Sequence, residues 1–134
     1  MSDNGLITIA SSHPFSDTVS RLEAALAAKG LAVFARVDHA AGAQTVGMAL
    51  RPTVVFMFGN PKAGTPLMQS DQRVGIDLPL RVLVWEDAGG TVQLTYNAPA
   101  WIAARHGLGG AAQGAVDAMT AVLDDVARKA TSRD

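Results

Sequence analysis

The segment best able to do chemistry is a glycine-bounded loop, Phe58-Gly-Asn-Pro-Lys-Ala-Gly-Thr-Pro-Leu-Met68, which follows a strongly apolar stretch. Gly59 and Gly64 allow a ligand to approach the backbone closely, and Lys62 places a cation between them. Thr65 is expected to cap a short helix that starts at the next proline, where free amides attract an anion. The loop therefore predicts a site for a small anionic or carbonyl-bearing molecule, although a plain strand-to-helix turn explains it equally well. The residues expected to hold the ligand are Asn60, Lys62, Gly64 and Thr65.

The same loop superficially resembles the phosphate-binding loop of nucleotide hydrolases. That motif needs a lysine and a hydroxyl residue directly after its second glycine. Here Thr65 and Pro66 follow Gly64, and the proline also removes an amide that a phosphate would use. Nucleotide hydrolysis is therefore not expected.

Other polar residues stand at the ends of expected strands. Asp38 and His39 close one strand, and we expect them to complete the site together with Tyr96, although a turn-forming aspartate and a solvent-facing or dimer-contact histidine explain them too. For Asp77 the sequence leaves three interpretations: it caps a turn, it pairs with Lys62, or it approaches a ligand. Tyr96 lies on an apolar strand face, where a buried hydroxyl needs a hydrogen-bond partner.

Two further functions compete with ligand binding. One is an acid–base enzyme in which His39 or His106 is the general base and Asp38 or Asp77 orients it. Such a pair needs a nitrogen-to-carboxylate distance of about 2.6–3.2 Å within a cleft. The simpler interpretation of His106 is a cation at the end of a helix. The other function is a protein–protein interaction module without a pocket, so whether the chain is an enzyme stays open.

Hydrophobic patterning predicts the elements that must position these residues. Alternating or continuous apolar runs predict five strands, of which 53–58 should be central and covered on both faces. The order is strand, helix, four strands and a final helix, with short helical insertions. This order favours an α+β fold, a two-layer sandwich with a mixed, mostly antiparallel sheet and helices on one face. The strands are expected at 6–10, 31–38, 53–58, 80–85 and 91–96, and the helices at 17–29, with Ser16 as cap, 99–106 and 112–128.

Composition excludes several classes of function. The chain has 134 residues, a net charge of −1, 49% apolar residues and no cysteine. These values predict one folded domain over residues 1–134, with frayed ends at 1–4 and 130–134, and exclude thiolate chemistry. Three scattered histidines lack metal-ligand spacing, so neither a metal nor a cofactor is expected. The balanced charge, the absence of an apolar run of about 18 residues and the acidic start predict a cytoplasmic protein that binds neither nucleic acid nor membrane.

Five segments follow one another along the chain: Asp38-His-Ala-Ala41, the 58–68 loop, Asp77-Leu-Pro-Leu-Arg-Val-Leu-Val-Trp85, Tyr96-Asn-Ala-Pro99 and Arg105-His-Gly-Leu108. Together they resemble the bacterial domain of unknown function 302 family, over roughly residues 5–108 and into the last helix. The resemblance implies a small α+β fold and a homodimer, and it implies no established reaction. If the polar positions of the family's pattern converge at one side of the sheet, they form a polar pocket below apolar walls. Those positions are Asp38, His39, Asn60, Lys62, Thr65, Asp77, Tyr96 and His106.

Overall fold

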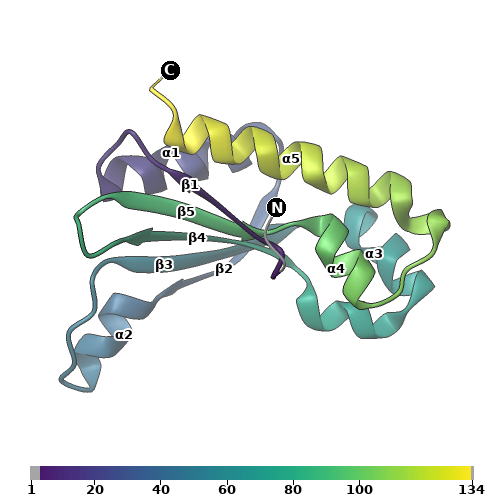
Figure 1. Cartoon of the computed structure of the whole chain (residues 1–134), viewed down its shortest axis with the longest axis horizontal. Helices are drawn as coiled ribbons and strands as arrows, with labels where there is room; N and C mark the ends of the chain where they lie inside the picture. Colours follow the sequence, from purple (N-terminus) through teal and green to yellow (C-terminus); the bar gives the residue numbers. More distant parts are fainter. Residues whose placement is uncertain (1–3, 134) are drawn as a thin grey trace.

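A five-stranded sheet carries two long helices on one face (Figure 1). The computed structural model describes residues 4–133. The strands are β1 (Leu6–Ala10), β2 (Ala32–Asp38), β3 (Thr53–Gly59), β4 (Leu80–Glu86) and β5 (Val92–Asn97). The helices are α1 (Phe15–Ala28), α2 (His39–Thr45), α3 (Pro61–Ser70), α4 (Pro99–Arg105) and α5 (Gln113–Thr131), with the short 3₁₀-helices η1 (Gln72–Asp77) and η2 (Gly110–Ala112).

The strand order across the sheet is β1-β5-β4-β3-β2, and every neighbouring pair is antiparallel. The expected α+β two-layer sandwich is confirmed, with the sheet antiparallel throughout rather than mixed. Strands β2 to β5 follow one another as neighbours. The connection through α1 instead carries the chain from one edge of the sheet to the other.

Alternating apolar residues build the core between the sheet and the helices α1 and α5. Val92, Leu94 and Tyr96 of β5 all face this core, as their spacing predicts. In β3 only alternate residues are buried, so the expectation of cover on both faces is wrong. The sheet therefore has one packed face and one open face. The helical residues that complete the core include Val19, Leu22, Leu26, Val116, Met119, Leu123 and Val126.

Strand β2 lies at the sheet edge, and the apolar face that its sequence predicts is largely unpacked. Val33 and Val37 are 42% and 39% exposed. Arg36 instead lies on the helix side, with its guanidinium 5.2 Å from the centre of the Phe56 ring and a 3.0 Å ion pair to Glu23 of α1. A bulge between Val33 and Ala35 shifts the strand register. The bulge explains why simple alternation fails for this strand.

Both ends of the helical layer differ from expectation. Helix α1 begins at Phe15, with Pro14 rather than Ser16 at the capping position. At the other end, α5 continues to Thr131, where Ala130 and Thr131 are buried and the Thr131 carbonyl accepts a 2.8 Å hydrogen bond from Ser12 N–H. These two residues are packed, so the expected fraying from residue 130 does not occur there; 1–3 and 134 lie outside the described residues. No helix within 4–133 combines the length and apolar character that crossing a bilayer requires.

Candidate functional site

The glycine-bounded loop is largely a helix. Helix α3 begins at Pro61, and Asn60 caps it by accepting a 3.0 Å hydrogen bond from Ala63 N–H at its side-chain oxygen. The prediction that Thr65 caps a helix starting at Pro66 is therefore wrong. Gly64 N–H donates to the Asn60 carbonyl at 3.3 Å. Since that amide is used within the helix, it cannot cradle an anion as the sequence suggested.

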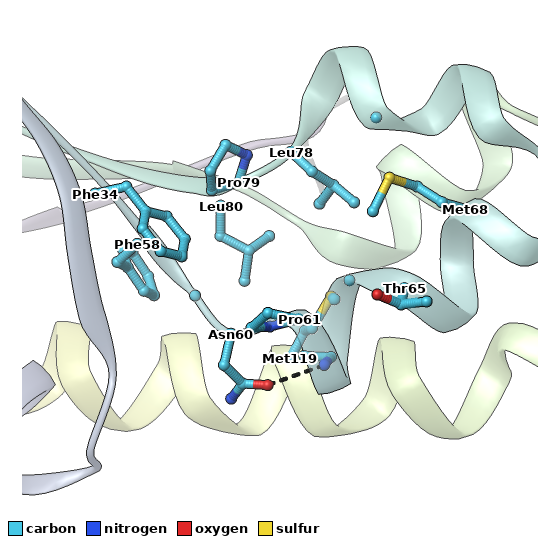
Figure 2. A pocket seen from close by; sticks show the side chains of 14 residues that line it. Phe34, Phe58, Asn60, Pro61, Thr65, Met68, Leu78, Pro79, Leu80 and Met119 are labelled. Atoms are coloured by element: carbon cyan, nitrogen blue, oxygen red, sulfur yellow. Dashed lines mark hydrogen bonds between the residues drawn. The ribbon is translucent and has the colours of Figure 1, made fainter.

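A pocket of about 290 Å³ opens beside this helix, between the end of β3, α3 and the chain that leads into β4 (Figure 2). We call it the α3 pocket. Its wall is almost entirely apolar, and Met119 contributes to it from α5. The side chains of Met68 and Leu78 point toward each other in Figure 2. The lining residues are Phe34, Phe58, Gly59, Asn60, Pro61, Ala63, Gly64, Thr65, Met68, Gly75, Leu78, Pro79, Leu80 and Met119.

Asn60 and Thr65 are the two lining residues of the α3 pocket with polar side chains. Asn60 uses its side-chain oxygen for the helix cap, and its amide nitrogen has no hydrogen-bond partner within residues 4–133. The Thr65 hydroxyl likewise has no partner in that part of the chain. Lys62 is exposed on α3 and does not line the pocket. The pocket thus offers two neutral hydrogen-bonding groups and no cation.

Tyr96 lies in the core rather than in the pocket. Its ring is 3% exposed, and its hydroxyl donates a 2.6 Å hydrogen bond to Asp124 of α5. This contact confirms that the buried hydroxyl needs a partner. Burial raises the pKa of Tyr96 well above its usual value, and the bond to Asp124 raises it further. Tyr96 therefore joins β5 to α5 as a neutral phenol.

Asp38 and His39 begin α2, away from the α3 pocket. Asp38 caps this helix by accepting a 2.9 Å hydrogen bond from Ala41 N–H. His39 is exposed, and the described contacts contain no hydrogen bond or ion pair between it and Asp38. The simpler interpretation of Asp38, a residue that forms the turn, agrees with this geometry.

Asp77 and His106 form the histidine–carboxylate pair that the sequence allowed. His106 Nε2 lies 2.6 Å from Asp77 Oδ2, and Arg105 Nη1 lies 3.0 Å from both oxygens of the same carboxylate. The His106 side chain is only 10% exposed. The prediction missed Arg105, although it directly precedes His106 in one of the segments that carry the family resemblance. Asp77 is thus bound to α4 and makes no described contact with Lys62.

A second hollow, of about 500 Å³, adjoins this pair on the other side of η1. We call it the η1 hollow, and Gln72, Arg73, Ile76, Arg105 and His106 line it. Asn60, Gly64 and Thr65 therefore share the α3 pocket, whereas His106 lines the η1 hollow with Asp77 bound to it. The expected convergence of all the polar positions on one pocket does not occur. Within residues 4–133, no group of three or more acidic, histidine or cysteine residues is placed to hold a metal ion.

The Asp71 carboxyl is held by Arg73 at the start of η1 and should titrate unusually low. The side-chain and backbone N–H groups of Arg73 donate to it at 2.8–3.1 Å, which lowers its pKa from 3.8 to about 2. The folded pKa lies below the unfolded one, so this pair stabilises the fold above pH 3.8 and the contribution is lost as the pH falls through 2. A carboxyl-detected NMR titration should find a midpoint for Asp71 near pH 2, and Arg73→Gln should raise it. An unchanged midpoint in that variant would contradict the assignment.

Comparisons with known proteins support the fold described above. A sequence profile described as "Domain of unknown function DUF302" matches residues 7–126. A crystal structure of an uncharacterised conserved DUF302 protein from Bacillus stearothermophilus superposes with a TM-score of 0.83 at 20% identity, covering 94% of this chain and 98% of that one. At that identity the likeness concerns the fold.

Curated relatives are longer than this chain. A protein of Brucella suis named "Fluoride-specific ion channel FluC 1" is 49% identical over 117 residues, which are 87% of this chain and 46% of the relative. A protein of the same name from Brucella abortus is also 49% identical, over 43% of its length. The chain thus spans less than half of these relatives, and their name describes the whole of each relative.

Proposed function

This chain belongs to the DUF302 family of domains of unknown function, and from its own geometry we propose that it binds a small, mainly apolar, carbonyl-bearing molecule in the α3 pocket. The observation that carries the proposal is the pocket itself, about 290 Å³ of mostly apolar wall beside the loop that the sequence singled out. Small-molecule sites in proteins are typically concave, apolar and supplied with a few polar groups.

The polar groups favour a carbonyl over an anion. The Asn60 amide nitrogen and the Thr65 hydroxyl each can donate one hydrogen bond to an oxygen of the ligand. Lys62 lies outside the lining, and the Gly64 amide is bonded within the helix. An anion placed in this apolar wall would lose hydration without gaining an opposite charge, which is costly. A carbonyl-bearing ligand therefore suits the α3 pocket better than an anionic one.

Native mass spectrometry of freshly purified protein tests the proposal first, because a bound molecule adds a defined mass to the chain. A second test uses 2-heptanone, a small methyl ketone, and follows methionine methyl groups by NMR. Met68 and Met119 line the pocket and should shift, while Met48, which is 67% exposed and outside the lining, serves as the control. Equal shifts of all three methyl groups, together with no added mass, would contradict the proposal.

A second candidate function is proton transfer at His106. The 2.6 Å distance between His106 Nε2 and Asp77 favours it, because it lies within the range that an oriented general base needs. An ionised carboxylate only accepts hydrogen bonds, so Nε2 carries the hydrogen and Nδ1 of the neutral ring is an acceptor. Nδ1 has no partner among the described residues.

The tautomer of His106 tests this second candidate. Long-range proton–nitrogen NMR correlations should show an unprotonated Nδ1 in the neutral ring of His106, while exposed His39 should show a mixture of tautomers. Asp77→Asn should disturb the His106 tautomer and leave that of His39 unchanged. A protonated Nδ1 in the neutral ring would exclude His106 as a base in this orientation.

We further propose that the domain acts as a cytoplasmic homodimer. The support for the dimer is the open face of the sheet, which is turned away from α1 and α5 (Figure 1). On that face Val37, Val55 and Leu83 are only partly covered. Sedimentation equilibrium should give twice the mass of the chain, and Val55→Glu should lower it. A monomer throughout the micromolar range would contradict this part of the proposal.

A further inference from the structure

The side chains that line the η1 hollow are cationic or neutral, whereas the residues around it also include two aspartates. Its polar lining residues are Gln72, Arg73, Arg105 and His106, and the lining contains no acidic residue. The two aspartates that pair with these arginines, Asp71 and Asp77, lie outside the lining. Two guanidinium groups and the side-chain amide of Gln72 therefore line the hollow, whereas the carboxylates that compensate the charges do not.

The aspartates hold both arginines without using all of their donors. Arg73 donates to Asp71 through Nε and Nη2, which leaves Nη1 without a partner among residues 4–133. Arg105 donates to Asp77 through Nη1 alone, which leaves Nε and Nη2 without one in the same range. A guanidinium carries five N–H donors in a fixed planar fork, so each arginine can bind a second acceptor while its aspartate fixes its position.

We propose that the η1 hollow binds an oxyanion, a carboxylate or phosphate group carried by a small molecule. The planar fork of a guanidinium matches the paired oxygens of such a group, and charge-assisted bonds of this kind are among the strongest hydrogen bonds. Ile76, which is 71% exposed at the hollow, offers apolar surface to the rest of the molecule. The site is independent of the α3 pocket, because the two lie on opposite sides of η1: Gly75 and Leu78 face the pocket, whereas Arg73 and Ile76 face the hollow.

Separate NMR titrations with phosphate, acetate and fluoride, at constant ionic strength with chloride as the balancing ion, test the proposal. Phosphate or acetate should shift the Nε signals of Arg73 and Arg105 and the amides of 72–77, and the stronger of the two identifies the kind of oxyanion. The fluoride titration is included because the curated relatives carry the name of a fluoride channel. A response to fluoride alone, or no saturable response to any of the three, would overturn the proposal.

Variants then assign the response to the hollow. Arg73→Gln and Arg105→Lys should each raise the apparent Kd about tenfold or more, since each loses a guanidinium fork. Arg73→Gln removes only an exposed contact between η1 and its capping residue Asp71, so the fold should survive. Arg128→Gln is the matched control, because Arg128 also pairs with an aspartate, Asp125, at 2.9 Å but lies elsewhere. Equal affinities in Arg73→Gln and Arg128→Gln would overturn the proposal, whereas Gly64→Leu, which fills the α3 pocket, should leave oxyanion binding unchanged.

Discussion

Gly64→Leu should strongly weaken ligand binding in the α3 pocket and leave the protein folded. A Cβ built at Gly64 lies 3.6 Å from Leu78 Cδ1 and 3.8 Å from Met68 Cε, at ordinary contact distances. The remainder of a leucine side chain would then extend into the pocket that these residues line. We expect binding of 2-heptanone, or of a copurified molecule, to weaken at least about 100-fold, equivalent to about 2.7 kcal/mol. Calorimetry or the methionine methyl titration measures this loss.

Gly64→Ala is the matched control for that variant. Its single methyl group fits the space at Gly64, and replacing a helical glycine by alanine stabilises a helix by about 0.5–1 kcal/mol. The melting temperature should therefore rise slightly, with ligand binding largely retained. If Gly64→Leu bound ligand as well as Gly64→Ala does, the α3 pocket would not be the binding site.

Gly5→Ala should lower the free energy of unfolding more than the other glycine-to-alanine changes, Gly30→Ala and Gly64→Ala. Gly5 has a φ of +79°, and a Cβ there would lie 2.4 Å from Cγ of Trp101 on α4. The left-handed backbone costs a non-glycine residue about 1–2 kcal/mol, and overpacking costs about 1–3 more. We expect the free energy of unfolding to fall by about 3 kcal/mol, measured by urea denaturation. Since α4 also carries Arg105 and leads into His106, the oxyanion response should weaken too.

Gly30→Ala separates the cost of the left-handed backbone from the cost of the contact with Trp101. Gly30 also has a positive φ, +69°, but nothing lies within 4 Å of a Cβ built there. It should therefore lose only the backbone contribution, about 1–2 kcal/mol. Equal losses in the two variants would show that contact with Trp101 contributes nothing.

Local pattern predicts the strands well where side chains alternate between a packed and an open face. Val92, Leu94 and Tyr96 show this directly, and the hairpin that joins β4 to β5 follows from the turn residues between them. Edge strand β2 has the same alternation, yet its bulge and the position of Arg36 toward α1 depend on contacts with another element. For this edge strand, the sequence pattern alone does not show which face a neighbouring helix will cover.

The start of α3 shows a different limit. Asn60-Pro61 and Thr65-Pro66 are both suitable beginnings of a helix, since each places a capping side chain before a proline. The chain uses the first, directly after β3 ends at Gly59, and this choice decides which amides are available. Asp77 and His106 are 29 residues apart and meet only because η1 packs beside α4. Composition and spacing could suggest each residue as a candidate, but they could not show that the two side chains are in contact.

The strand order also predicts how the molecule assembles in time. Strands β2 to β5 pair with their neighbours in the chain, whereas β1 pairs with β5 across large sequence separations, such as Leu6 with Asn97. Contacts between distant residues carry a larger loop-closure entropy and form more slowly. We therefore expect β2 to β5 to form an early folding unit and β1 to dock late, so that its amides exchange with solvent first. Gly5, immediately before β1, would then affect the rate of unfolding far more than the rate of folding.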